Sequence, residues 1–213
     1  MAITYPRQLP DNLRMQEAWI DLIDPVSMQP SKNLINISQV VEPYWQGKFV
    51  TPPLEHLSEQ PLWSAWNKSL RMSRTFIAFD VRRKTPLAYQ SAKVPTDIAG
   101  AWAGTCVVSS LGTSGALGLS SLPLATYQFK VGDRIGLEQS GKYGYYEVLE
   151  DVVASGSAAT VTVSPFLHTT LFTTSAVARL WRPWCQFIMD KTSWSEQGTV
   201  EKQPISFQGT QRL

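Results

Sequence analysis

The sequence predicts a mainly β protein: a belt-like β-barrel or sandwich with one α-helix, interrupted by an inserted small OB-like β-barrel. Three observations predict this fold class. Apolar and polar residues alternate with a period of two in both end segments of the chain. Only one convincing stretch has helical spacing, and the middle of the chain consists of short β-branched or aromatic segments separated by Gly/Ser clusters.

Composition divides the 213 residues into three parts. Residues 93–177 contain four Lys/Arg and six Asp/Glu, whereas the two ends together contain 15 basic and 11 acidic residues and seven of the eight tryptophans. A middle so unlike both ends indicates an insertion. We therefore divide the chain into residues 1–92, the first part of the belt domain, 93–177, the inserted OB-like barrel, and 178–213, the returning belt strands. One continuous β domain with a plain middle stretch is the alternative.

The first end segment is expected to contain several strands. Residues 17–25 alternate apolar and polar residues and end at an Asp-Pro turn, which is typical of a half-buried strand. Further strands are expected over 33–41, which follows the turn-forming MQPSKN, over the aromatic run 43–53 and over 76–81. The proline pair at 52–53 must end the third of these strands, because proline cannot donate to a ladder.

The one helix is predicted over residues 61–71. Leu62, Ala65, Trp66 and Leu70 follow the spacing of one helical face and are expected to face the core. A proline at the first helical position fits, because the N–H that it lacks has no partner within the helix there.

The middle of the chain is expected to be all β. Strands are predicted over 105–111, 133–139, 143–152 and 159–166. Gly132 lies in a Val-Gly-Asp turn that requires a positive φ. About five short strands around a small core are typical of a closed OB or SH3-like barrel.

The last part contains three expected strands, over 185–190, 192–197 and 204–209. The strands before residue 92 have no obvious partners among themselves. We therefore expect the returning strands to complete one sheet system with them.

No catalytic, cofactor-binding or metal-binding residue is identified, and we expect neither an enzyme nor a bound cofactor. The sequence contains no HExxH, no phosphate-binding loop and no GxSxG elbow. Glu147, Glu150 and Asp151 cluster at a strand end and are the remaining candidates for a hydrolase acid/base pair, but an ordinary solvated rim is the better interpretation. The first 16 residues have no apolar run, so we expect no membrane span.

Two sets of residues are candidates for binding. Lys68, Arg71, Arg74, Arg82 and Arg83 form the candidate interface; a solvated helix face and turn is the alternative, and contact with DNA phosphates is less favoured. The tyrosines of the middle part form a candidate exposed aromatic face that could bind a carbohydrate or a neighbouring subunit, although they could simply pack the barrel. They are Tyr143, Tyr145 and Tyr146.

The order of these parts resembles the distal tail proteins of long, flexible-tailed bacteriophages. The resemblance rests on the helix ending in Leu-Arg, the strand FIAFDV, the inserted barrel with Val131-Gly132-Asp133, the return strand CQFIMD and the terminal Ile205-Ser206-Phe207. It covers nearly the whole chain in architecture, through short motifs. Residues 1–16 depart from it, because they show no clear strand pattern.

The resemblance implies a structural virion protein without catalytic residues. Such a protein forms a homohexameric ring at the distal end of the tail tube and joins the tube to the tail-tip hub and the receptor-binding apparatus. Its expected partners are other copies of itself, the tail tube protein, the hub protein and receptor-binding or fibre proteins, with DNA only as cargo passing through the ring. The expected location is the tail tip of the virion, after synthesis in the host cytoplasm. A carbohydrate- or receptor-binding module of a tail, or a neighbouring hub or tube-completion protein, is the alternative.

Overall fold

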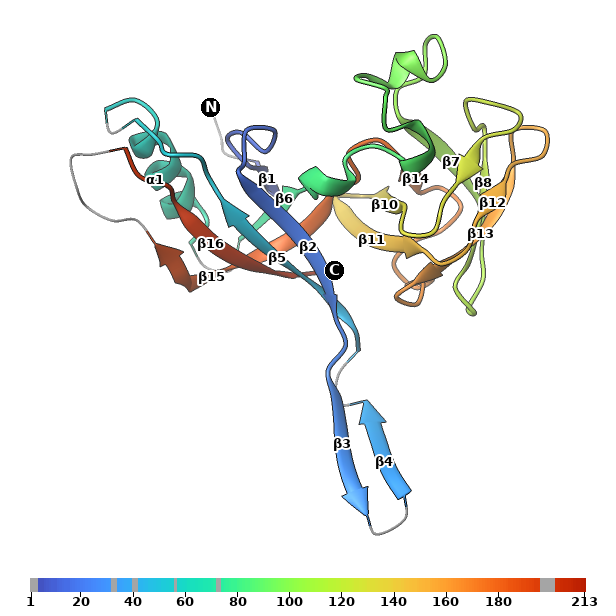
Figure 1. Ribbon diagram of the computed structural model, residues 1–213, viewed down its shortest axis with the longest axis horizontal. Coiled ribbons are helices and arrows are strands. Elements are labelled where there is room, and N and C mark those ends of the chain that lie inside the picture. Colours follow the sequence, from blue (N-terminus) through green and yellow to red (C-terminus); the bar gives the residue numbers. More distant parts are fainter. Residues whose placement is uncertain (1–3, 32–33, 40–41, 56, 72–73, 196–201) are drawn as a thin grey trace.

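The computed structural model describes residues 4–31, 34–39, 42–55, 57–71, 74–195 and 202–213. It is mainly β with a single α-helix within those ranges, as the sequence predicts. A six-stranded sheet with the helix lies on one side of the molecule and a closed barrel on the other. A two-stranded arm projects away from both (Figure 1).

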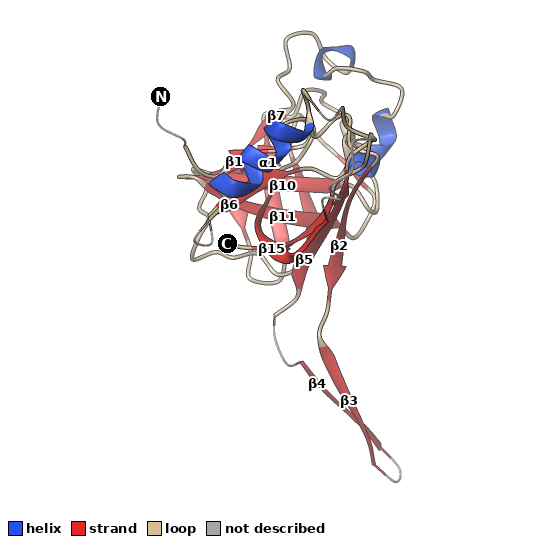
Figure 2. Cartoon of the chain, turned by 90° about the vertical axis from the view of Figure 1, so that its left-hand side faces the viewer, coloured by secondary structure: helices blue, strands red, loops and turns tan. Residues whose placement is uncertain are grey.

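Strands from both ends of the chain form the six-stranded sheet. The two strands that follow the barrel in the sequence lie at its centre, between strands that precede the barrel. All neighbours are antiparallel except the first pair. The order is β1 (Arg7–Gln8), β6 (Thr75–Ala78), β15 (Cys185–Ser195), β16 (Ser206–Gln211), β5 (Tyr44–Val50) and β2 (Glu17–Ile23). The sheet stays open at β1 and β2, and helix α1 (Gln60–Ser69) covers one of its faces (Figures 1 and 2).

The face that α1 buries differs from the predicted one. Leu62 is 58% exposed and Ala65 is also exposed, whereas Trp63 and Trp66 are buried together with Leu70 just after the helix. Spacings of three and four residues connect this face as well as the predicted one, so the periodicity alone allowed both. Burying both indoles removes more apolar surface from water, which explains the rotation of the helix toward Trp63.

The core between α1 and the sheet is largely aromatic. The ring of Trp66 lies 5.4 Å from that of Phe76 and 5.6 Å from that of Phe207. Phe207 stacks on Phe49 at 5.1 Å, and Phe76 stacks on Phe187 at 5.5 Å. Each such ring pair contributes about 0.5–1.5 kcal/mol beyond the area that it buries. Rings from β5, β6, β15 and β16 thus join the two ends of the chain.

The barrel is closed by six antiparallel strands. Their order around the barrel is β10 (Arg134–Gln139), β11 (Lys142–Val148), β13 (Ala159–Ser164), β8 (Ala116–Ser120), β7 (Thr105–Leu111) and β14 (Val177–Arg179). The last strand returns beside β10, so β14, β10, β11 and β13 form a Greek key. An OB-fold has five strands, and the barrel continues to Arg179, past the expected boundary at residue 177. A short pair, β9 (Gln128–Phe129) and β12 (Val152–Val153), lies beside it.

Three segments differ from the expected elements. The stretch expected to be a turn before residue 33 is a strand, β3 (Val26–Ser31), which pairs with β4 (Leu34–Gln39) to form the arm. Strand β8 lies within a Gly/Ser cluster that was expected to be a loop. A Cβ on Gly118 would come within 2.2 Å of Ser110 Oγ and 3.1 Å of its backbone nitrogen, so a larger residue would have to displace the serines where the register of β7 is irregular. The strands expected over 185–190 and 192–197 begin as one continuous strand, β15, and residues 196–197 lie outside the described residues.

The segment between the sheet and the barrel contains three 3-10 helices, η1 (Val81–Arg83), η2 (Leu87–Tyr89) and η3 (Pro95–Asp97). The predicted Val-Gly-Asp turn holds this segment. Gly132 has φ +88°, as expected, and the Asp133 carboxylate accepts hydrogen bonds from the backbone N–H groups of Lys130 (2.8 Å) and Leu87 (2.6 Å). Asp133 therefore fastens the incoming chain to the barrel.

Candidate assembly surfaces

The arm is an extension of the sheet that has no third strand within the described residues. Strands β3 and β4 pair only with each other, so each has a free outer edge. Six residues per strand give a length of about 20 Å. Neither strand contains a charged residue, and a lone two-stranded ribbon is at best marginally stable in water. Pro30 lacks an N–H, which leaves β4 with the more complete hydrogen-bonding edge.

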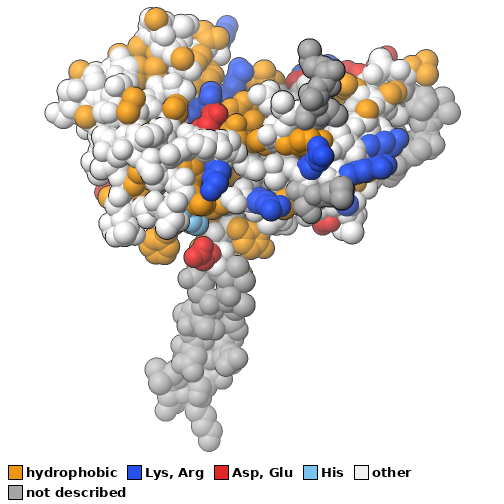
Figure 3. Space-filling model, turned by 180° about the vertical axis from the view of Figure 1, so that it is seen from behind, with side chains coloured by type: hydrophobic (Ala, Val, Ile, Leu, Met, Phe, Trp, Pro, Cys, Tyr) orange, Lys and Arg blue, Asp and Glu red, His pale blue; other side chains and the backbone are white. Residues whose placement is uncertain are grey.

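A groove lies where the arm leaves the body. It has a volume of about 470 Å³ and is lined by residues of the arm root and of the barrel, among them Val26, Pro43 and Phe166. Phe166 is 69% exposed and Leu149 is 51% exposed. Hydrophobic side chains flank the root of the arm on the face shown in Figure 3. Exposed apolar side chains beside an unpaired ribbon are typical of a surface that another protein covers.

The structure divides the predicted basic interface into two groups. Arg82 and Arg83 are held within the chain. Arg82 Nη2 lies 2.9 Å from Asp80 Oδ2 and 3.0 Å from Asp21 Oδ1, and the hydrogen bond to the buried Asp80 raises the pKa of Arg82 above its usual range. Arg83 Nη1 donates to the carbonyl of Gly132 at 2.7 Å. These two arginines therefore stabilise the fold.

The other three predicted basic residues surround the end of α1. Lys68, Arg71 and Arg74 are exposed. The guanidinium of Arg74 lies over the Tyr5 ring, 4.3 Å from its centroid. None of the three pairs with a carboxylate in the described part of the chain. They remain a candidate interaction surface.

The predicted exposed tyrosine face is wrong. Tyr145 is 0% exposed and Tyr146 is 1% exposed. Tyr143 is half-buried, and its hydroxyl donates to Glu138 Oε1 at 3.3 Å. The physical reason is that β11 lies between two cores: Tyr146 packs inside the barrel, and Tyr145 packs in the core of the six-stranded sheet. Alternate residues of a strand point to opposite faces, and the second face is exposed only when no other part of the protein packs on it.

Tyr145 lies at the centre of a buried junction between sheet and barrel. Its ring meets the ring of Trp45 edge-on at 5.1 Å, and Trp45 Nε1 donates to the Tyr145 carbonyl at 2.6 Å. The buried Arg134 guanidinium lies 4.5 Å from the centroid of the Trp45 ring and donates to Glu147 Oε2 at 2.6 Å. Sequence analysis missed Trp45 and Arg134. The signal in the sequence was an arginine next to the apolar residues of the strand predicted over 133–139.

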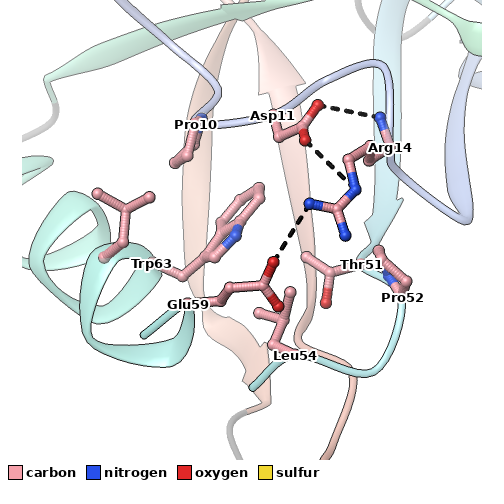
Figure 4. Close-up of a pocket in the computed structure, with 9 residues that line it drawn as sticks. Pro10, Asp11, Arg14, Thr51, Pro52, Leu54, Glu59 and Trp63 are labelled. Carbon is pink, nitrogen blue, oxygen red and sulfur yellow. Dashed lines mark hydrogen bonds and ion pairs between the residues drawn. The ribbon is translucent and has the colours of Figure 1, made fainter. Parts of the chain in front are cut away.

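A small pocket lies beside the start of α1 (Figure 4). Arg14 connects two carboxylates there: its Nη1 lies 3.2 Å from Glu59 Oε1, and its Nε lies 3.7 Å from Asp11 Oδ2. The indole of Trp63, which is 3% exposed, forms one wall. The volume is about 160 Å³, below the range of about 300–1,000 Å³ that is usual for small-molecule sites. Both carboxylates are held by Arg14, so the pocket is best explained as packing between the helix and the loop over Asp11.

The remaining reactive groups do not come together. Glu147 pairs with Arg134, and Asp151 Oδ2 lies 2.7 Å from Lys130 Nζ, so each carboxylate has its own cation. No group of three or more His, Cys, Asp or Glu side chains that could hold a metal occurs among the described residues. Both cysteines are buried and free, and burial raises the pKa of Cys106 to about 12, which keeps this thiol protonated and unreactive.

No helix in the described ranges is long and apolar enough to cross a membrane. Comparison with models of known protein families gives no match, and no curated protein matches the sequence.

Proposed function

We propose that this protein is a structural, ring-forming subunit at the distal end of a long, flexible phage tail, where it joins the tail tube to the tip. The observation that carries the proposal is the arm: β3 and β4 extend the sheet by about 20 Å and have no partner strand within the described part of the chain. A monomer gains little from such a ribbon. In a ring, the arm of one subunit can reach the neighbouring subunit and pair with it.

The arrangement of sheet and barrel supports the same proposal. A sheet completed by strands from both ends of the chain, with a closed barrel inserted between them, has the order of parts that the resemblance implies, although the sheet is open and does not close into a belt-like barrel. The arm projects from one side of the molecule (Figure 1), so its contact with the body of a neighbouring copy would join two different surface patches. Repeated contacts between different patches are heterologous, and they produce rings when the rotation closes.

The proposed partners follow from this role. They are other copies of the chain, in a homohexamer, the tail tube protein on one side, and the hub with receptor-binding or fibre proteins on the other, with DNA passing through the ring. The proposed location is the virion tail tip, and we propose no enzymatic activity. A carbohydrate-binding role is not proposed, because two of the three tyrosines that suggested it are buried.

Purification of the full chain, alone and mixed with the tail tube protein of the same phage, tests the proposal. Size-exclusion chromatography with light scattering should give a mass of several subunits, and negative-stain images should show rings, at least in the mixture. A chain that stays monomeric in both samples at high micromolar concentration would contradict the proposal.

A further inference from the structure

A groove with a basic rim lies at the C-terminal end of helix α1, where the helix meets β15. Its volume is about 440 Å³. The floor is aliphatic and the rim is polar or basic. The lining residues are Asn67, Lys68, Leu70, Arg71, Ile188, Met189 and Lys191. The groove therefore combines apolar contact with positive charge.

Positive charge accumulates around this groove without compensation. Five cationic side chains surround the last turn of α1, and in the described part of the chain none of them forms an ion pair: Arg7, Lys68, Arg71, Arg74 and Lys191. The partial negative charge at a helix C-terminus amounts to about half an elementary charge, which balances only a fraction of five. Figure 3 shows lysine and arginine side chains gathered over the half of the molecule that carries the sheet.

The surroundings of Lys191 show how close the positive charges lie to one another. Its Nζ donates to the backbone carbonyl of Asn67 at 2.9 Å and to Asn67 Oδ1 at 2.6 Å. Its third close neighbour is the Met189 sulfur at 3.6 Å, which is only a weak acceptor. Partial burial and the nearby charge of Arg71 lower the pKa of Lys191. The adjacent Asp190 forms no ion pair with Lys191 in the described part of the chain; its carboxylate accepts from the Thr192 N–H (2.9 Å) and hydroxyl (2.7 Å).

We propose that this groove binds the carboxylates of an acidic, partly apolar segment of a partner protein. Arg71 offers a planar fork that fits a carboxylate, and Lys191 and Lys68 supply point charges on either side. The aliphatic floor formed by Leu70, Ile188 and Met189 suits an apolar side chain between the acidic ones. Single-stranded nucleic acid fits less well, because no aromatic ring lines the groove for bases to stack on.

This inference does not depend on the proposed ring. It would hold for any acidic partner, and it concerns a surface separate from the arm. Ring formation that survives loss of the groove charges would leave the proposed function intact, whereas the binding measurement described next tests the groove alone.

The test measures binding of the full chain to a labelled eight-residue peptide of six glutamates and two leucines, by fluorescence anisotropy at about 50 mM salt. The test variant is Arg71→Gln with Lys191→Met. The matched control is Lys93→Gln with Lys142→Met, which removes the same charge from two exposed lysines outside the groove. We expect the test variant to bind at least tenfold more weakly than wild type, the control to bind within threefold of it, and Arg71→Lys to be intermediate.

Several results would overturn the proposal. These are absence of peptide binding to wild type, an equal loss in the control, and tighter binding of an eight-nucleotide oligo-dT than of the peptide. Because Lys191 also caps the helix, Lys68→Gln with Arg71→Gln serves as a second variant with an intact cap. A direct readout is the side-chain NMR titration of Lys191: its pKa should rise when the peptide is bound, and an unchanged value would contradict carboxylate binding at this site.

Discussion

Replacing Trp45 by alanine should separate the stability of the sheet–barrel junction from that of the rest of the fold. Trp45 is fully buried, its ring packs edge-on against Tyr145, and its indole N–H donates to the Tyr145 carbonyl. Truncating a buried aromatic residue costs about 3–5 kcal/mol. A buried carbonyl left without its donor costs about 1–3 kcal/mol more. Since contributions of contacting groups overlap, we expect a total loss of about 4–6 kcal/mol in the free energy of unfolding.

Two further variants make this measurement specific. Trp45→Phe keeps one ring but loses the donor and part of the buried ring volume, so it should cost less than Trp45→Ala and at least the roughly 1–3 kcal/mol of the carbonyl left without a donor. Trp19→Ala, on the neighbouring strand β2, is the matched control: Trp19 is 39% exposed, and the cations of Arg82 and Lys48 lie 5.0 Å and 5.8 Å from its ring centroid, so its loss should cost about 1 kcal/mol or less. Urea unfolding at pH 7, followed by far-UV circular dichroism, gives all three values. A loss for Trp45→Ala no larger than that for Trp19→Ala would refute a junction built on this indole.

Three other predictions follow from the geometry. Trp66→Ala should cost about 3–5 kcal/mol and Leu62→Ala less than about 1 kcal/mol, and equal losses in urea unfolding would contradict the observed helix face. Replacing residues 26–39 by two glycines should change the free energy of unfolding by less than about 1 kcal/mol, because the arm projects away from the sheet and the barrel (Figure 1), yet should abolish rings in negative stain; intact rings would show that the arm is not the contact. Burial raises the pKa of Cys106 to about 12 and that of Cys185 well above its usual value. An unfolded thiol loses its proton near pH 8.5, so the stability present below that pH should fall as pH rises above it, by up to about 1.4 kcal/mol per pH unit for each thiol. The double Cys→Ala variant should show a shallower decline in urea unfolding between pH 8.5 and 9.5, and parallel declines would exclude the thiols as its source.

Period-two alternation predicted the strands well where one face of a strand meets water. In β2, Ala18 and Ile20 are fully buried, whereas Trp19 between them is 39% exposed, which follows the alternation. The same reasoning failed at β11, because a second core covers the outer side of that strand and buries Tyr145. Local pattern carries no information about what packs on the far side of a strand.

The candidate surfaces were only partly predictable for a related reason. Lys68, Arg71 and Arg74 lie close together in the sequence, so they could be grouped from it. Lys191 joins them only because β15 pairs beside β6 near the helix end, a contact between residues more than 100 positions apart. Strand β3 was not predicted either. It contains Gln, Pro and Ser, and these residues are more typical of turns than of strands.

The placement of β15 and β16 at the centre of the sheet has a consequence for synthesis of the chain on the ribosome. Until these strands emerge, β1 and β6 form one strand pair and β2 and β5 another, and the two pairs share no ladder hydrogen bonds. The whole barrel is translated between Ala78 and Cys185, an interval on the order of five to twenty seconds at usual bacterial elongation rates. During that interval the barrel can close, whereas the edges of β5 and β6 that later pair with β16 and β15 have no partner strand. Nascent chains stalled just before residue 185 should therefore recruit chaperones through the sheet fragments and not through the barrel.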